Sequence, residues 1–269
     1  MLTDCYFRRS LALTHQGANM TERRDRKQDE QIPIQPVARI GGALYLVIIV
    51  IGLLGEAVVR GSLIVPGDAA ATAQRILASE FLWRLGVAGQ LLLLICAIAL
   101  MLVFYLLLRP VSRMLALAAV YFGLVSLAVE SVSALFLQQA LAPLTSSLYA
   151  QAANPQPLHA QAYLAILAHN NAFGIALIFF GVECLILGYL IRKSTYFPAA
   201  IGWLMQLAGL CYLVNSFSMV LSPPLQGVLF PFILLPSLVG ESAFCLWLLF
   251  RGVDPAAWAR VISSTAASR

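Results

Sequence analysis

Charged side chains are scarce in this chain. Its 269 residues include 17 Lys and Arg and 12 Asp and Glu, which make up 11% of the sequence, whereas 61% of the residues are hydrophobic. A soluble domain typically has about 25% charged residues, because polar side chains must cover its core. The composition therefore excludes a soluble enzyme, a disordered protein and a secreted disulfide scaffold, and it predicts an integral membrane protein.

Residues for metal, redox and nucleophilic chemistry are also few. The three histidines are widely spaced and the five cysteines form no C-x-x-C pair, so the sequence predicts no metal site. Four cysteines fall in apolar runs, where Cys packs as a small hydrophobic residue: Cys96, Cys184, Cys211 and Cys245. The sequence has no H-E-x-x-H, G-x-S-x-G or Walker motif. We therefore assign no catalytic residue and expect no cofactor.

Long apolar runs are abundant. A helix needs about 20 mostly apolar residues to cross a bilayer, and the run LLLLICAIALMLVFYLLL at 91–108 shows no two-residue alternation. Backbone groups in hydrocarbon must find partners within their own segment, which favours helices. We predict an all-α polytopic membrane protein with six spans, at about 39–59, 86–108, 113–137, 172–191, 199–221 and 228–250.

Basic residues are distributed unevenly about these spans. With the N-terminus inside, fourteen Lys and Arg fall on the cytoplasmic side and three on the other, namely Arg60, Arg75 and Arg84. Because Lys and Arg concentrate in cytoplasmic loops, we expect both termini in the cytoplasm. The net charge of +5 then indicates contact with anionic lipid at that face and no nucleic-acid partner.

The segments outside the spans carry signals of their own. Residues 1–38 are polar with mixed charges, which predicts a disordered cytoplasmic tail without a cleaved leader, and 254–269 form a second tail. In the outer connection 63–84, Pro66-Gly67 predicts a turn and Asp68 a helix cap, and Trp83 is typical of a membrane interface. Prolines at 143, 155 and 157 are expected to interrupt the second connection, 138–171, before a helix from Leu158. Together these connections predict a small outer cap.

Four glutamates inside the spans are the most informative residues, because a charge in the bilayer core costs about 2.5–3.5 kcal/mol. Glu56 has Arg60 four residues later, which predicts an interfacial ion pair. Glu130 shares a helix face with Gly123, Ser126 and Ser133, which predicts either a hydrogen-bonded helix contact or the wall of a polar cavity.

The other two glutamates fall near the middle of their spans. Glu183 shares its span with Gly174, Gly181 and Gly188, whose seven-residue repeat predicts a close-packed helix contact. Glu241 is flanked at i−4 and i+4 by Ser237 and Cys245, and Pro231 and Pro236 precede it, which predicts a kinked sixth helix. With His169 and Asn215 in the outer halves of their spans, these residues suggest a polar cleft reaching toward Glu241.

Several stretches of the chain resemble a family of bacterial membrane proteins, the domain of unknown function 4386. They are RIGGALYLVIIVIGLLGE, VRGSLIVPGDAAATAQRILASE, LLRPVSRMLAL, FFGVECLILGYLI and LLPSLVGESAFCLWLLFRGV, between Arg39 and Val253. The resemblance implies a six-helix protein of the bacterial inner membrane and supplies no activity. Gly240-Glu241 matches the family pattern, whereas the family often has His at the position of Glu183, which favours Glu241 as the functional glutamate.

Three functions remain open. The first is a non-catalytic membrane subunit or sensor that binds a lipid, a small ligand or a protein partner at the outer cap, near Asp68–Arg75. The second is a carrier for a small solute or for protons, with Glu241 or Glu130 as the titrating group. The third is an intramembrane enzyme acting on a lipid-like substrate, for which the sequence lacks a nucleophile–base pair or a metal set.

Overall fold

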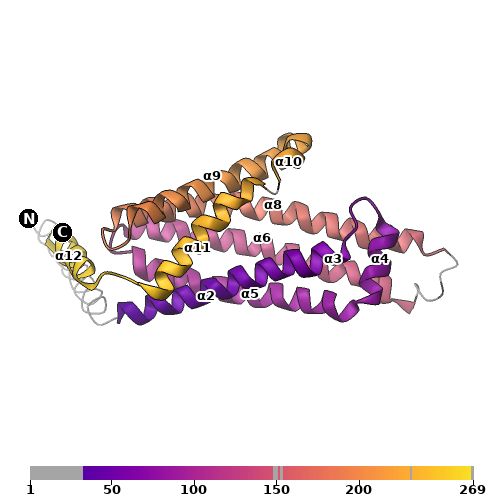
Figure 1. The fold of residues 1–269 in the computed structure, drawn as a ribbon, viewed down its shortest axis with the longest axis horizontal. Coiled ribbons are helices and arrows are strands. Elements are labelled where there is room, and N and C mark those ends of the chain that lie inside the picture. Colours follow the sequence, from indigo (N-terminus) through magenta and orange to yellow (C-terminus); the bar gives the residue numbers. More distant parts are fainter. Residues whose placement is uncertain (1–32, 148–150, 152–153, 231, 268–269) are drawn as a thin grey trace, which may run out of the picture.

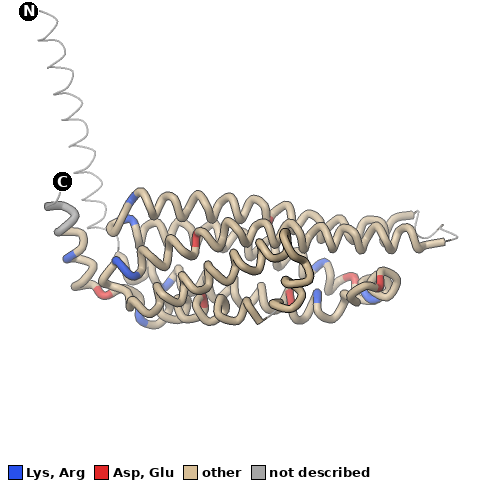
Figure 2. The backbone as a smooth tube through the Cα atoms, turned by 90° about the horizontal axis from the view of Figure 1, so that it is seen from above, with Lys and Arg blue, Asp and Glu red and all other residues tan. Residues whose placement is uncertain are grey.

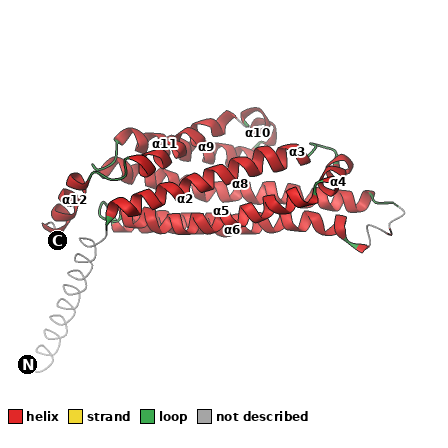
Figure 3. Cartoon of the chain, turned by 60° about the horizontal axis from the view of Figure 1, so that its bottom comes forward, coloured by secondary structure: helices red, strands yellow, loops and turns green. Residues whose placement is uncertain are grey.

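The computed structural model describes residues 33–147, 151, 154–230 and 232–267, and this part of the chain consists of helices joined by loops, with no strand (Figure 3). Six of its helices are long and apolar enough to cross a membrane, which confirms the predicted all-α class. They are α2 with its continuation through η1 and α3 (Ile34–Leu63), α5 (Glu80–Leu108), α6 (Arg113–Thr145), α8 (Gln156–Lys193), α9 (Ala199–Leu221) and α11 (Leu235–Phe250), which the 3₁₀ turn η2 (Phe232–Leu234) precedes.

The six long helices form a closed ring. Each packs against the next one along the chain, and α11 packs against α2. Figure 1 shows them running along the long axis of the molecule, with α4 (Ala69–Ala78) lying across them at one end and α12 (Pro255–Ala267) at the other. We call these the cap end and the basic end.

The basic end is named for the charges that gather there. Because successive helices alternate in direction, the helix termini that carry five of the ten described Lys and Arg meet at this end: Arg109, Arg113, Arg192, Lys193 and Arg251. Figure 2 shows this concentration of Lys and Arg (blue) near α12, with Asp and Glu (red) spread along the molecule. The helix ring thus separates a basic end from a cap end of mixed charge.

Helix boundaries depart from the expected ones where proline was expected to end a helix. Pro143 lies inside α6, which continues to Thr145. The expectation of a break there was wrong because Leu141 and Leu144 on either side are buried in a hydrophobic cluster at the cap end, and this packing favours the helix. Two other prolines lie at helix starts, where proline is well tolerated: α2 begins right after Pro33, and α8, which starts at Gln156, carries Pro157 in its first turn.

The predicted tails coincide only in part with the structure. Residues 1–32 lie outside the described residues, whereas 34–38 already belong to α2. Most of the second tail is helix α12, whose start is capped by Asp254 Oδ1, which accepts from the backbone N–H groups of Ala256 (2.9 Å) and Ala257 (3.1 Å). This helix rests on the basic end through Trp258, whose ring lies 5.0 Å from that of Tyr196.

The outer cap is built around α4. Asp68 caps this helix as predicted, because its Oδ1 accepts from the backbone N–H of Ala71 at 2.8 Å. Trp83, in contrast, is only 2% exposed, and its indole N–H donates to the carbonyl oxygen of Leu137 at 3.1 Å. The expectation of an interfacial Trp83 did not include this contact, in which the side chain packs between helices.

Helices α8 and α9 approach each other closely along a seam of glycines, as the seven-residue repeat predicts. A Cβ built on Gly188 would lie 2.5 Å from the carbonyl oxygen of Gly202, and one on Gly209 would lie 2.5 Å from that of Gly181. Backbone therefore packs directly on backbone, which only glycine allows. This seam fixes how α8 and α9 present their polar side chains to the interior of the ring.

Candidate functional site

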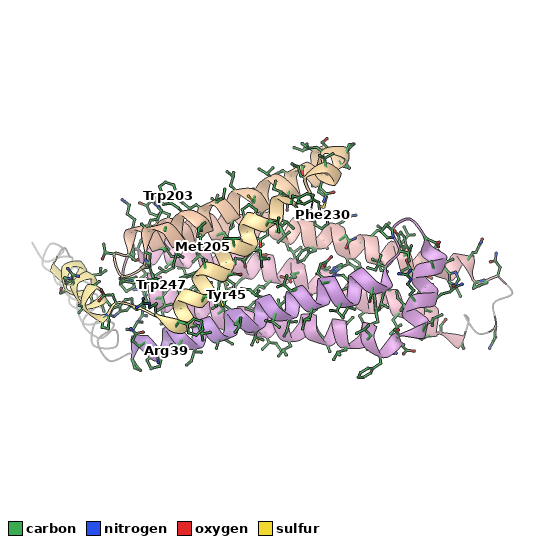
Figure 4. All side chains as sticks on the ribbon, in the orientation of Figure 1. Arg39, Tyr45, Trp203, Met205, Phe230 and Trp247 are labelled. Atoms are coloured by element: carbon green, nitrogen blue, oxygen red, sulfur yellow. The ribbon has the colours of Figure 1, made fainter. Side chains whose placement is uncertain are left out.

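Glu241 of α11 is bound by two tyrosines from two other helices. Tyr45 of α2 donates its hydroxyl hydrogen to Glu241 Oε2 at 3.0 Å, and Tyr212 of α9 donates to Oε1. Figure 4 marks Tyr45 where α2 passes α11. Glu241 is 8% exposed, and each of its carboxyl oxygens accepts a hydrogen bond from a protein hydroxyl inside the ring.

Local features of α11 bring Glu241 to this position. Gly240 lets α11 approach α9, since a Cβ there would lie 2.7 Å from the carbonyl oxygen of Leu204. The flanking residues tether the helix on both sides: Ser237 Oγ donates to the carbonyl oxygen of Ala208 at 3.1 Å, and Cys245 Sγ donates to that of Gly42 at 3.4 Å. These bonds orient Glu241 between α2 and α9.

The predicted kink in the sixth helix is wrong. The chain instead breaks ahead of Glu241: α10 (Pro223–Leu229) ends, η2 makes a single 3₁₀ turn, and α11 starts at Leu235 with Pro236 in its first turn. A proline at that position starts a helix without losing a hydrogen bond. Pro231 lies outside the described residues.

Glu183 of α8 is a second carboxyl group inside the ring. It is 1% exposed, and neither of its oxygens has a hydrogen-bond partner among the described residues. Phe180, three residues before it on α8, packs its ring 5.2 Å from that of Tyr212, the donor to Glu241. The structure therefore brings two of the predicted glutamates into one region, which we call the central site and define as Tyr45, Glu183, Cys184, Tyr212 and Glu241.

Aromatic rings fill the space between the central site and the basic end. Phe244, one turn after Glu241, stacks on Phe104 at a centroid distance of 5.4 Å and meets the edge of Phe197 at 5.7 Å. Tyr45 in turn packs its edge against Phe104 at 5.8 Å. These packed aromatic side chains thus separate the central site from the basic end.

The remaining predicted residues lie nearer the cap end. Glu130 accepts a hydrogen bond from Gln90 Nε2 of α5 at 2.6 Å. His169 Nδ1 lies 2.6 Å from Ser133 Oγ, so this part of the predicted polar face of α6 is a hydrogen-bonded contact with α8. These two pairs are separate from Glu241, whose carboxyl partners among the described residues are the two tyrosines.

Glu56 and Arg60 form an ion pair of 2.7 Å within the π-helical segment η1 (Gly55–Arg60). The two partners differ in burial: the Arg60 side chain is 13% exposed and that of Glu56 is 63% exposed. The guanidinium therefore lies mostly inside the cap end, whereas the carboxylate of Glu56 faces outward.

Asn215 is buried on α9, and its Oδ1 has no partner among the described residues. The structure shows no hydrogen bond from it to Glu241, so the cleft suggested by the sequence is not seen as a connected chain of polar groups. Ser216, next to it, is also buried with an unpartnered hydroxyl in the described part of the chain. Both residues stay candidates for ligand contact and not members of the central site.

Sequence reasoning identified Glu241 and Glu183 but missed Tyr45, Tyr212 and Gln90. Tyrosine in an apolar run is an ordinary lipid-facing or packing residue, and a single sequence gives no sign of which way its hydroxyl points. Gln90 was overlooked although a buried amide in a long apolar run needs a partner. The described residues contain no group of three or more His, Cys, Asp or Glu side chains able to hold a metal ion.

Comparison with known proteins gives a family and no function. No curated protein matches the chain. No solved structure matches it either. The family model described as domain of unknown function (DUF4386) matches residues 40–252, which include the central site and the six long helices except for the first six residues of α2. The chain therefore belongs to the DUF4386 family, as the sequence motifs predict.

Proposed function

We propose that the protein is a non-catalytic sensor or subunit of the bacterial inner membrane, with both termini in the cytoplasm. In this proposal the protein responds to what binds at Glu241. The observation that carries the proposal is the bonding of one carboxyl group to hydroxyls from α2 and α9, at the place where the ring closes.

The contact between α2 and α11 differs from the other contacts in the ring. The other neighbouring helices are consecutive along the chain, whereas α2 and α11 are the first and last long helices and are held by their side-chain and backbone contacts. One such contact is the hydrogen bond of Tyr45 to Glu241, and another is the close approach of Gly42 to the backbone of Leu249. We call this contact the closing seam.

Binding of a ligand or a proton to Glu241 weakens the hydrogen bonding at the closing seam. A ligand or proton that takes one carboxyl oxygen removes the acceptor of a buried tyrosine hydroxyl, and an unsatisfied buried donor costs about 1–3 kcal/mol. Tyr45 is buried beside Phe104 and Phe244, so its hydroxyl group cannot reach solvent unless α2 or α11 moves. The expected response is a shift of α2 against α11.

The test measures the distance across the closing seam. Spin labels at Leu46 of α2 and Leu246 of α11, both exposed, are introduced into a background without the native cysteines, and the distance distribution is recorded while pH is stepped or a solute panel is added. We expect a shift that is lost in Glu241→Gln and kept in Glu80→Gln, an exposed matched control. No shift under any condition, or a shift that survives Glu241→Gln, would refute the proposal.

A carrier is the second candidate, and one observation favours it. The central site contains two buried carboxyl groups, and no Lys or Arg of the described residues forms an ion pair with either. Such residues line ion and proton pathways in transporters. In proteoliposomes a carrier shows substrate- or pH-dependent flux that Glu241→Gln abolishes, and the absence of flux across the panel, or its survival in the variant, rejects this function.

Two partners belong to the proposal as well. Anionic lipid is expected at the basic end, where Arg113 begins α6 and Arg192 and Lys193 end α8. A protein partner or small ligand is expected at the outer cap, near Asp68–Arg75. Recovery of a partner that is unchanged by substitutions across this segment would count against a role for the cap.

A further inference from the structure

The side chain of Glu183 is buried in the ring beside two groups that offer it no hydrogen bond. A Cβ built on Gly123 of α6 would lie 2.6 Å from Glu183 Oε2 and 2.5 Å from Met101 Sδ of α5, so the carboxyl group occupies the space that a glycine leaves open. Both carboxyl oxygens lack a partner among the described residues. A buried ionised group without a partner is strongly unfavourable, so something must neutralise it.

The titratable groups around Glu183 provide no positive charge. The titratable groups of the central site are all acids or hydroxyls, from α11, α2, α9 and α8: Glu241, Tyr45, Tyr212 and Cys184. From α5 and α6 it is faced by Met101 and Gly123, which do not titrate. The compensating positive charge therefore comes from outside the set of described side chains.

The two carboxyl groups of the central site differ in their donors. Glu241 accepts hydroxyl hydrogens on both oxygens, an arrangement that stabilises a carboxylate. Glu183 accepts none, so its stable form is the neutral acid. The geometry thus makes Glu241 the better place for a negative charge and Glu183 the better place for a bound proton.

A proton fits Glu183 better than a metal cation. Hard cations take six or more oxygen ligands at close range, whereas the groups beside this carboxyl are a thioether sulfur and a glycine backbone. We propose that Glu183 is a proton-binding site at the centre of the helix ring, and that it exchanges its proton in response to the charge on Glu241. This deepens the proposed function, on which it rests for the role of Glu241, by naming the proton as a ligand of the central site.

The test is infrared spectroscopy of the full chain in lipid nanodiscs, in the region where protonated carboxyl groups absorb. We expect a band at neutral pH that shifts when glutamate is labelled with ¹³C at the side-chain carboxyl. Glu183→Gln is expected to remove the band, whereas Glu130→Gln and the exposed control Glu80→Gln are expected to keep it. A missing band in the wild type, or a band that survives Glu183→Gln, overturns the proposal.

Two further experiments test the proposal even if Glu183→Gln fails to fold. In Gly123→Ala the new methyl group collides with Glu183 Oε2, so the band must shift in frequency, and a glutamate band that stays in place belongs elsewhere and overturns the assignment. Sodium chloride exchanged for choline chloride must leave the band unchanged, since loss of the band with sodium identifies a metal cation in place of the proton.

The result is distinguishable from a failure of the proposed function. The infrared band reports the proton on Glu183 whether or not α2 moves against α11. If the infrared band is present but the spin-label distance across the closing seam never changes, Glu183 is a proton site and the sensor function is rejected. If the distance changes but the band is absent, only the proton site is rejected.

Discussion

Replacing Gly188 by Ala tests the close packing of α8 on α9. The added Cβ would lie 2.5 Å from the carbonyl oxygen of Gly202 and 2.8 Å from the backbone nitrogen of Gln206, whereas an ordinary contact of this kind is at least 3.4 Å. The two helices must then separate by roughly 1 Å, because a backbone atom cannot rotate away. Overpacking of this kind costs about 1–3 kcal/mol, and the better helix propensity of Ala returns at most about 1 kcal/mol, so we expect a net loss of about 1–2 kcal/mol in the free energy of unfolding.

Two other glycines provide a graded series. Gly52 of α2 has only the Leu93 side chain near its open face, at 3.7 Å, so Gly52→Ala is expected to leave stability unchanged or to raise it. At Gly174 the colliding atoms belong to the end of the Met219 side chain, which can move, so Gly174→Ala is expected to cost less than about 1 kcal/mol.

The assay follows the seam through a natural reporter. Trp203 of α9 stacks on the guanidinium of Arg192 of α8, with 3.3 Å between the guanidinium carbon and the ring centroid, so separation of these helices changes its environment (Figure 4). Titration with SDS in mixed micelles, followed by tryptophan fluorescence, gives the free energy of unfolding for each variant. If Gly188→Ala proves as stable as Gly52→Ala, the close contact of the two backbones is refuted.

Two further predictions concern the cap end. Asp68→Ala removes the acceptor of the Ala71 N–H and is expected to destabilise α4 by about 1 kcal/mol. Hydrogen exchange should then become faster in α4 alone, and Asp68→Asn should stay close to wild type. Unchanged exchange in Asp68→Ala would contradict the role of this cap. Trp83→Phe leaves the carbonyl of Leu137 without its buried donor and is expected to lower stability by about 1–3 kcal/mol; an unchanged thermal unfolding midpoint would show that the hydrogen bond contributes nothing.

The spans and the local signals were predictable because their causes lie within a few neighbouring residues. A run of about 20 apolar residues has to be a helix in hydrocarbon. Asp68 caps its helix through an atom three residues away, and the repeat of Gly174, Gly181 and Gly188 places small residues on one face whatever the partner is. The existence of a seam followed from the sequence, whereas its partner, α9, did not.

The errors arise where distant segments decide the outcome. Pro143 stays in α6 because neighbouring leucines are buried at the cap end. The sixth helix breaks and restarts at Leu235 instead of kinking. A single sequence does not show which side chains from other helices surround each of these positions.

At the central site, too, side chains from other helices decide how each residue is surrounded. Glu183 and Glu241 are both mid-span glutamates in apolar runs, and their sequence surroundings give similar expectations. Their difference lies in two hydroxyl groups from α2 and α9, which are both directed at Glu241. Glutamine is therefore a different perturbation at each position. At 241 its amide oxygen can still accept from one tyrosine while its NH₂ faces the other hydroxyl, whereas at 183 it brings two donors to a place where the present carboxyl finds no partner. Equal effects of the two substitutions on the closing seam would mean that the tyrosines do not distinguish the two carboxyl groups.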